Sequence, residues 1–436
     1  MEESNILIPE GWERVKFSEY ISFQEGPGLM SFLFREVGFP FINIRCIENG
    51  KINKESCQFL SEEIAQNQYK HFQLEENDLI VSTSGTLGKK AFVKKSDLPL
   101  LLNTSIIRFK PKDTDVMSLN FLNFLLEDNS FLYNLYSQST GSAQVNVGPT
   151  HLKKLFITIP KTSKEQNKIA EILSKVDKAI SETEIIIAKY NRIKTGLIQD
   201  LLTKGTDEEG NIRNEKTHKF KDSPLGRIPN EWSCKTIDDI SERLRSGVTP
   251  KGGSNVYQEE GIMLIRSQNV YPYGFKLNDV AYINDEINIR MLGSQLNEND
   301  VLLNITGASI GRATYVPNNF PKANVNQHVC AIRLKDSNSS KAIFLSVFLN
   351  SIYGQNQIYQ NINGSNREGI NYTQIKEIKL PSFNSDRELE MFINMIFKIN
   401  TKIESEEIKL AKLKSTKTGL MQDLLSGKKR VTHLIN

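Results

Sequence analysis

Two long stretches of the chain carry apolar residues at alternating spacings of three and four positions. Residues 165–203 and 388–426 contain no proline, and their only interior glycines are Gly196 and Gly419. A 3.5-residue period is that of the apolar seam of a coiled coil, and at about 1.5 Å per residue each helix would extend roughly 58 Å. The seam residues are Ile169, Leu173, Val176, Ile180, Ile187, Tyr190, Leu197 and Leu201 in the first stretch, and Phe392, Ile396, Ile399, Ile403, Leu410, Leu413, Leu420 and Leu424 in the second.

Matching polar residues interrupt both seams: Thr183 and Lys194 in the first stretch, Glu406 and Lys417 in the second. Polar seam residues fix the register of paired helices at a cost in stability. Interruptions at the same two places therefore predict that the two helices pair with each other. The open alternative is that each is an ordinary amphipathic helix packed on its own globular domain.

The segments before each helix, from about 1 to 160 and from about 226 to 381, mix short β-rich runs with turn residues. Residues 78–83 and 300–305 are strand-like, and each run ends in a glycine-bearing turn. Helical patterns occur as well, so we expect an α+β protein with two similar domains of mixed α/β content. The predicted boundaries are 1–162 for the first globular domain, 163–205 for the first helix, 206–225 for a linker, 226–383 for the second globular domain and 384–430 for the second helix.

The second half of the chain repeats the first. The two tryptophans stand in matching phrases, IPEGW ending at Trp12 and IPNEW ending at Trp232. They lie roughly 220 residues apart, a far longer period than that of solenoid repeats. Further pairs follow in the same order: FINIRCI from Phe41 with LIRSQNV from Leu264, ENDLIVSTSGTLGK from Glu76 with ENDVLLNITGASIGR from Glu298, STGSAQ around Gly141 with INGSNR around Gly364, and TGLIQDLLTKG from Thr195 with TGLMQDLLSGK from Thr418. This collinear series indicates a tandem duplication.

Composition excludes several classes of protein. The net charge of +4, from 55 Lys and Arg against 51 Asp and Glu, is unlike that of a basic tail or coat protein but permits local basic patches. No apolar run approaches about 18 residues, so we expect no membrane span, and the acidic start MEESNILIPEGW lacks the apolar region of a signal peptide. Cys46, Cys57, Cys234 and Cys330 are scattered without metal-ligand spacing, which favours reduced thiols in a cytoplasmic protein and no metal site.

The chain also lacks the common enzyme signatures. It has no GxxxxGK[ST] phosphate loop, no strand–GxGxxG–helix unit and no HExxH or GxSxG motif. Its five histidines share no repeat position, which argues against a duplicated catalytic base. We therefore expect no catalytic residues in this chain and no cofactor bound to it.

The turn from Ser84 to Lys90 and its counterpart from Thr306 to Arg312 combine glycine, small residues and cations. Free backbone N–H groups beside a cation can hold a phosphate, although a plain glycine turn between two strands is the favoured interpretation. Under either interpretation, Lys89, Lys90 and Arg312 are expected to contact the phosphate backbone of DNA.

Positions that differ between the two copies are candidates for specificity, because duplicated domains keep what the fold requires and change what the target requires. Asn43 aligns with Arg266, and Gln144 aligns with Arg367. Arg reads guanine edges and Asn or Gln reads adenine edges in the major groove, so the two copies could read different bases. Solvated loop residues are the alternative at any single position. The candidate DNA-binding residues are Asn43, Arg45, Lys89, Lys90, Ser142, Gln144, Arg266, Gln268, Asn269, Arg312, Ser365, Asn366 and Arg367.

In this combination of features the chain resembles the specificity subunit of type I restriction-modification enzymes. The resemblance rests on the IPxxW phrases at Ile8 and Ile228, the TGLxQDLL helix ends at Thr195 and Thr418, and the SPLGRIPNEW junction at Ser223, and it covers essentially the whole length. It implies two target-recognition domains separated by two helices that form an antiparallel coiled coil, with a pseudo-two-fold relation between the copies. Each domain would read one half of a bipartite site in double-stranded DNA.

The resemblance also implies partners and cofactors. Two modification (methyltransferase) subunits would dock on the helices, and restriction (motor-nuclease) subunits would complete the complex. Those subunits would bind S-adenosylmethionine, ATP and Mg and would perform adenine methylation and DNA cleavage. The helices would set the unread spacer of the site, so that deleting the heptad Leu173–Ala179 would shorten it.

Two other classes of function compete with this interpretation. One is an elongated protein-binding scaffold with duplicated globular domains. A standalone nuclease is weaker, because no carboxylate cluster recurs between the copies. Steep salt dependence of duplex binding would separate a DNA reader from a scaffold.

Overall fold

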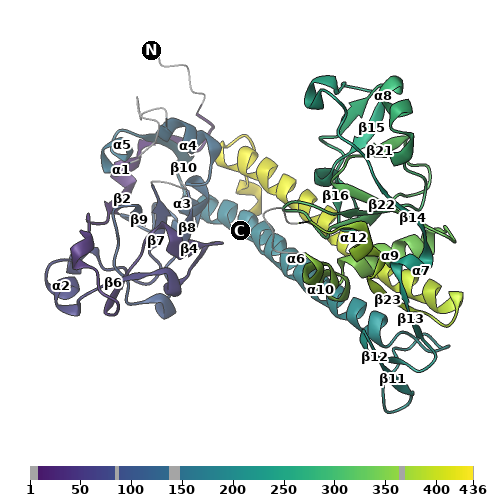
Figure 1. Cartoon of the computed structure of the whole chain (residues 1–436). Coiled ribbons are helices and arrows are strands. Elements are labelled where there is room, and N and C mark those ends of the chain that lie inside the picture. Colours follow the sequence, from purple (N-terminus) through teal and green to yellow (C-terminus); the bar gives the residue numbers. More distant parts are fainter. Residues whose placement is uncertain (1–7, 84–87, 137–147, 363–368, 436) are drawn as a thin grey trace. The chain divides into compact units, whose positions relative to one another are not determined.

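The computed structural model describes residues 8–83, 88–136, 148–362 and 369–435 and divides into two compact units (Figure 1). Unit 1 comprises Met1–Glu184 and Ile408–Asn436, and unit 2 comprises Ile185–Glu407. The boundaries fall inside the two long helices, α6 (Ser163–Thr203) and α12 (Asp386–Leu425). Each unit therefore combines one globular domain with one half of both helices.

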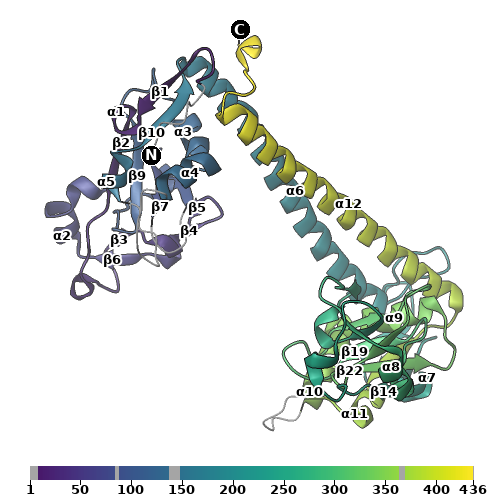
Figure 2. The same ribbon diagram turned by 90° about the horizontal axis from the view of Figure 1, so that it is seen from above.

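Within each unit the halves of α6 and α12 run antiparallel, side by side (Figure 2). In unit 1, Asp177 pairs with Lys417 and Glu184 with Lys414, both at 2.8 Å, so the residue number falls along α12 as it rises along α6. Every predicted seam residue is buried or half-buried. The prediction that the two helices pair with each other is confirmed.

The alternative of helices packed on their own domains is also partly met. Ile169 and Leu173, at the start of α6, belong to the apolar core of unit 1, and Phe392 and Ile396, at the start of α12, belong to that of unit 2. The seam is therefore continuous with both cores, because each helix begins by packing on the domain that precedes it.

The globular part of unit 1 is built on a four-stranded antiparallel sheet in the order β2-β9-β7-β8. Helices α3 and α4 supply apolar side chains to the core beneath it. A separate pair, β1 with β10, joins the start of the domain to the strand before α6. The bounds are β1 Trp12–Lys16, β2 Ile21–Glu25, β7 Leu79–Ser82, β8 Lys90–Phe92, β9 Ile106–Pro111, β10 Phe156–Pro160, α3 Leu119–Leu125 and α4 Asn129–Tyr136.

Unit 2 repeats this architecture. Its four-stranded antiparallel sheet has the order β14-β22-β19-β20, and β13 pairs with β23 as β1 does with β10. A three-stranded sheet, β18-β15-β21, lies beside it, and β15 and β21 are parallel. The bounds are β13 Ser233–Thr236, β14 Ser241–Ser246, β15 Ile262–Ile265, β18 Ala281–Ile283, β19 Val301–Asn304, β20 Ala313–Tyr315, β21 Ala323–Val325, β22 Val329–Leu334, β23 Lys379–Ser382 and α9 Ser339–Asn350.

The duplication extends to single turns. Asn77 and Asn299 have left-handed φ values of 69° and 66°. The aspartate after each, Asp78 or Asp300, is buried and accepts a hydrogen bond at 2.8 Å from the backbone N–H three residues earlier. Identical phrases thus fold into identical turns, which is why the repeat could be read from the sequence.

The end of each long helix packs against the tryptophan of the other copy: the end of α6 against Trp232, and the end of α12 against Trp12. Gly205, after α6, has φ 61°, and a Cβ there would overlap the ring of Trp232. Gly427, after α12, has φ 72°, and a Cβ would lie 2.9 Å from Trp12. The two conspicuous tryptophans therefore mark the places where the TGLxQDLL helix ends dock on the domains.

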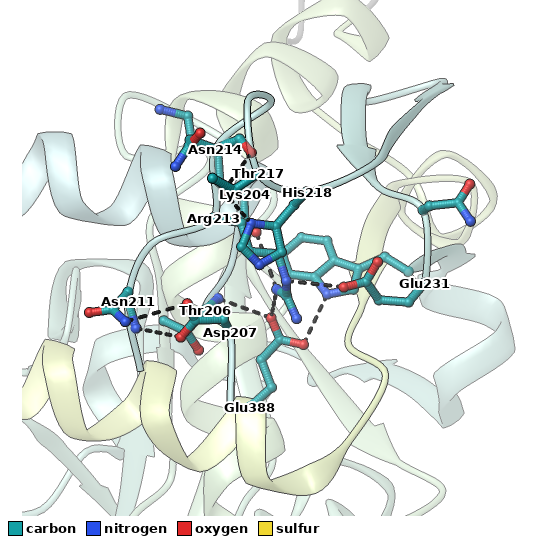
Figure 3. A network of polar contacts seen from close by, with 12 residues as sticks. Lys204, Thr206, Asp207, Asn211, Arg213, Asn214, Thr217, His218, Glu231 and Glu388 are labelled. Atoms are coloured by element: carbon teal, nitrogen blue, oxygen red, sulfur yellow. Dashed lines mark hydrogen bonds and ion pairs between the residues drawn. The ribbon is translucent and has the colours of Figure 1, made fainter. Parts of the chain in front are cut away.

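Residues 206–225, predicted as a linker, are part of unit 2. Arg213 is buried there and binds Glu388 of α12 and Glu231 (Figure 3). The segment then forms a hairpin from β11 (Phe220–Ser223) and β12 (Gly226–Pro229). Among the helices in the part of the chain that the structure describes, none is both long and apolar enough to cross a bilayer.

Candidate nucleic-acid interface

Several strand ends of unit 2 meet at one end of its sheets. β14 and β19 finish there and β22 and β20 begin there, so the connecting loops lie together. The parallel strands β15 and β21 also finish there, and the Asn326 N–H donates to the Ile265 carbonyl at 3.1 Å. We call this surface, made of residues 247–251, 266–268, 305–312 and 326–328, the loop face of unit 2. Loops on a rigid sheet are where binding residues concentrate.

Two predicted base readers are held on this face by one acid. The Arg266 guanidinium donates to the Asp279 carbonyl at 3.0 Å, and its Nη2 lies 3.6 Å from the Asp279 carboxylate. Gln268 is exposed and donates to the same carboxylate at 2.6 Å. Gln268 thus lies at the surface, and Arg266, whose side chain is 23% exposed, lies half-buried beside it.

Asn269, the third candidate in this segment, is a structural residue. It is buried, its Oδ1 accepts from Arg266 N–H at 3.0 Å, and its Nδ2 donates to the carbonyls of Lys276 and Asp279. Because the chain itself uses both ends of the amide, its assignment as a base contact is corrected here. The residue type was right for a reader, but burial decides the role.

Two tyrosines on the hairpin of β16 (Val270–Tyr271) and β17 (Gly274–Phe275), beside the loop face, each contact a cation from another element. The Arg312 guanidinium lies 4.9 Å from the centre of the Tyr271 ring. Lys194 of α6 lies 3.7 Å from the ring centre of Tyr273, and burial lowers the pKa of this lysine. The polar interruption of the seam at Lys194 therefore docks the hairpin on the helix through a cation–π contact.

The turn from Thr306 to Arg312 is a glycine turn, the interpretation favoured from the sequence. Gly307 and Gly311 have φ values of 76° and 86°. The N–H groups of residues 310–312 donate within the chain, to the carbonyls of Gly307, Asn304 and Ser309. Those three amides are therefore not available to a phosphate, whereas the half-buried Arg312 side chain can contact one.

Unit 1 places its candidates in the same frame. The Asn43 N–H donates to the Cys46 sulfur at 3.4 Å, as Arg266 N–H does to Asn269. Asn43 is half-buried, and Arg45 is exposed. Lys89 follows a glycine with φ 80°, at the position that Arg312 occupies in unit 2.

Lys90, in contrast, belongs to the interior of unit 1. Its Nζ lies 2.6 Å from Glu127 and donates to the Asn123 carbonyl at 2.5 Å. Lys417, the polar interruption of the second seam, binds Glu127 at 3.0 Å and Asp177 at 2.8 Å. The expectation that Lys90 contacts phosphate is therefore wrong, because its charge is already paired inside the domain.

Glu127 holds two lysines in this cluster, and its replacement by glutamine is expected to destabilise unit 1 by about 2–3 kcal/mol at pH 7. Burial alone raises the pKa of Glu127, but Lys90 and Lys417 outweigh it and hold that pKa below the ordinary value. A lowered folded pKa stabilises above the unfolded value of about 4.3, and the benefit disappears as the pH falls through the folded pKa. Urea unfolding of the wild type and Glu127→Gln at several pH values tests this, with the exposed Glu182→Gln as control. Equal stability at pH 7 would contradict it.

Five candidates lie outside the residues that the structure describes: Ser142, Gln144, Ser365, Asn366 and Arg367. Gly369, the first described residue after the second of these segments, pairs with Thr306 in the loop face of unit 2.

Comparison with known proteins identifies the fold's family. The family model described as "Type I restriction modification DNA specificity domain" matches residues 9–190 and 229–411. The chain belongs to the type I restriction-modification DNA specificity family. The two matched ranges are the two copies of the repeat.

Relatives within this specificity family span the whole chain. The type I restriction enzyme MjaVIII specificity subunit of Methanocaldococcus jannaschii is 24% identical over 439 residues, which cover 99% of this chain and 96% of that protein. The putative MjaX specificity subunit of the same organism is also 24% identical, with 97% and 95% covered.

Solved structures support the fold. The S subunit of a type I restriction-modification system from M. genitalium superposes with a TM-score of 0.56 at 17% identity, covering 97% of this chain and 98% of that one. A chain from a structure titled for complex assembly and conformational transition of the type I R-M system gives 0.60 at 14% identity, with 96% and 98% covered. At these identities the likeness concerns the fold alone.

Three polar residues of the loop face were not among the candidates that the sequence suggested. Thr249, Gln327 and His328 lie on the loop face of unit 2 and bind one another in a row. The histidines were judged only as possible duplicated catalytic bases, and His328 has a serine in the matching place. A difference between copies at that position was nevertheless the available signal.

Proposed function

We propose that this chain reads a bipartite site in double-stranded DNA, with the loops at the sheet end of each unit contacting one half of the site. The observation that carries the proposal is the convergence of loops in both units at equivalent strand ends. In unit 2 they present Arg266, Gln268 and Arg312; in unit 1 they present Asn43 and Lys89. Arginine and amide side chains read base edges, and cations contact phosphates.

The modification and restriction subunits of the type I system are proposed as the partners. Methylation and cleavage would be theirs, together with S-adenosylmethionine, ATP and Mg. Two exposed isoleucines support docking of modification subunits on the helices: Ile185 of α6 is 62% exposed and Ile408 of α12 is 65% exposed. They occupy matching positions in the repeat, as two copies of one partner require.

The helices are further proposed to set the length of the unread spacer. α6 leads from unit 1 into unit 2, and α12 leads back. The ion pair between Glu184 of α6 and Lys414 of α12 joins the two helices and involves no residue of the DNA-facing loops. Spacing and base reading would therefore be separable properties of the chain.

The proposal is tested by salt-dependent binding of duplex DNA to the complex of this chain with its modification subunits, together with genome-wide methylation mapping. Arg312→Ala and Lys89→Ala are each expected to weaken binding to all sequences about equally. Each should also reduce the slope of log K against log salt by about one, because one phosphate contact is lost.

Lys322→Ala is the matched control, since Lys322 is exposed and precedes β21, at the end opposite the loop face. A wild-type complex with no steep salt dependence and no bipartite methylated site would favour the protein-binding scaffold instead. Unchanged slopes in both variants would remove Arg312 and Lys89 from the interface.

A further inference from the structure

The turns at residues 103–105 and 326–328, which lead into β9 and β22, have the same backbone hydrogen-bond frame in the two units. In unit 1, Thr83 N–H donates to the Ser105 carbonyl at 3.0 Å. In unit 2, Ile305 N–H donates to the His328 carbonyl, also at 3.0 Å. Each turn starts at an asparagine, Asn103 or Asn326, whose side chain accepts a hydrogen bond from the backbone of the turn. The frame is therefore fixed from both sides.

A glycine from the neighbouring loop closes each frame. A Cβ at Gly26 would lie 2.5 Å from backbone atoms of Asn103, and a Cβ at Gly247 would overlap the Val325 carbonyl oxygen. No other residue can approach so closely. The two turns are thus packed in equivalent, rigid surroundings.

The side chains carried by this common frame differ completely. Unit 1 has Thr104 and Ser105, and unit 2 has Gln327 and His328. In both units the first residue is exposed and the second is half-buried. A constant backbone with different exposed side chains is what two readers of different sequences require, and these positions lie at the sheet end where the loops converge.

In unit 2 a row of hydrogen bonds fixes the exposed amide. The Thr249 hydroxyl donates to Gln327 Oε1, and Gln327 Nε2 donates to His328 Nε2 at 3.2 Å. With its Nε2 accepting, the imidazole carries its proton on Nδ1 and donates to Thr306 Oγ1 at 2.6 Å. The row holds both ends of the Gln327 amide and leaves it a second N–H and a second lone pair for a ligand.

We propose that Gln327 reads an adenine edge in the major groove, with His328 and Thr249 as its positioning residues, and that Thr104 occupies the equivalent reading position in unit 1. The inference rests on the proposed DNA-reading function. A glutamine amide presents a donor and an acceptor side by side, which matches adenine N7 and N6. Because the side chain is held before binding, less conformational entropy is lost on contact.

Exchange of the two pairs tests the inference in the full complex with modification subunits. Gln327→Thr combined with His328→Ser is expected to relax or change the preference at one base position, or two adjacent ones, of a single half-site. Discrimination against the wrong base there should fall by about ten- to a hundredfold. The reciprocal exchange, Thr104→Gln with Ser105→His, should alter only the other half-site. Genome-wide methylation maps of wild type and both exchanges show which positions change.

Single variants separate reading from positioning. Gln327→Ala should relax the base preference at the same position as the exchange does. The variant is expected to fold, because the Gln327 side chain is exposed. His328→Ala should weaken binding to the cognate site while leaving adenine preferred, because the reading amide remains. Asn318→Ala is the control, an exposed amide in the loop between β20 and β21, away from the loop face.

Two outcomes would overturn the inference while the DNA-reading function stands: a bipartite wild-type map with both half-sites unchanged in Gln327→Ala, or changes in both half-sites from a single exchange. A wild-type complex that methylates no bipartite site would overturn the proposed function and the inference with it.

Discussion

Replacing Glu388 by alanine is expected to destabilise unit 2 by about 3–5 kcal/mol and to lower its unfolding midpoint by about 10 °C. Glu388 is buried at the start of α12 and accepts hydrogen bonds from three residues, two of them in the segment 206–225 and the third at Trp232 (Figure 3). Its Oε1 accepts from Arg213 and from Thr206 N–H at 3.1 Å, and its Oε2 accepts from Trp232 Nε1 at 3.0 Å. Alanine would leave a buried guanidinium and two buried N–H groups without this acceptor.

Unit 1 supplies an internal comparison. Glu165, at the matching place in α6, accepts two hydrogen bonds from Arg430 at 2.6 and 2.7 Å. The Arg430 side chain is 28% exposed, against 9% for Arg213, and Trp12 Nε1 has no hydrogen-bond partner among the described residues. Glu165→Ala is therefore expected to cost less, about 2 kcal/mol.

Calorimetry of the full chain distinguishes these expectations. Glu390→Ala is the control, since Glu390 is exposed on the same helix. The expected order of destabilisation is Glu388→Ala, then Glu165→Ala, then Glu390→Ala near zero. A Glu388→Ala protein as stable as the control would show that the cluster contributes no net stability.

The helices and the duplication were predictable because both are patterns along the sequence. The heptad spacing places Ile169 and Leu424 on one face of each helix regardless of what lies elsewhere, and repeated phrases such as those around Asp78 and Asp300 fold alike. Local chemistry and the periodicity of apolar residues are sufficient for such features.

Features that depend on distant partners were not predictable. Arg213 meets Glu388 from 175 positions away, and Arg430 meets Glu165 from 265 positions away. Neither arginine sits in register in the repeat. The polar seam residues Lys194 and Lys417 were interpreted as register devices. Lys417 does pair with Asp177 of α6, but it also binds an acid after α3, and Lys194 contacts the β16–β17 hairpin, so both lysines also contact the globular domains.

The candidate site shows the same division. Residue type suggested Lys90 and Asn269 as DNA contacts, but Glu127 and the carbonyls around Asn269 already use their polar groups. Gln327 and His328 were overlooked because nothing in their residue types or spacing along the sequence marked them as DNA contacts. Their importance lies in a frame shared with Thr104 and Ser105, which only the backbone hydrogen bonds show. Burial and pairing, which a single sequence does not specify, decide which polar residues are free to bind.

Removing one heptad from both helices is expected to shorten the spacer of the recognised site by about three base pairs and leave both half-sites unchanged. Seven residues span about 10 Å of helix, and a base-pair step about 3.4 Å. The heptad Leu173–Ala179 is unsuitable, because Leu173 lies in the core of unit 1 and Asp177 binds Lys417. Residues 187–193 together with 401–407 are preferable, since both deletions preserve the seam and the antiparallel register of the remaining pairs and keep Ile185 and Ile408.

Deleting 187–193 alone is the matched control, because it shortens one helix against an intact partner and should destabilise their pairing. Methylation mapping of the double deletion, with the modification subunits present, gives the half-sites and the spacer in one measurement. If the half-sites changed while the spacer did not, the helices would not be the element that sets spacing, and base reading would depend on them instead. If only the spacer changed, the loops at the sheet end of each unit would be independent readers, because these loops and the strands that carry them contain none of the deleted residues.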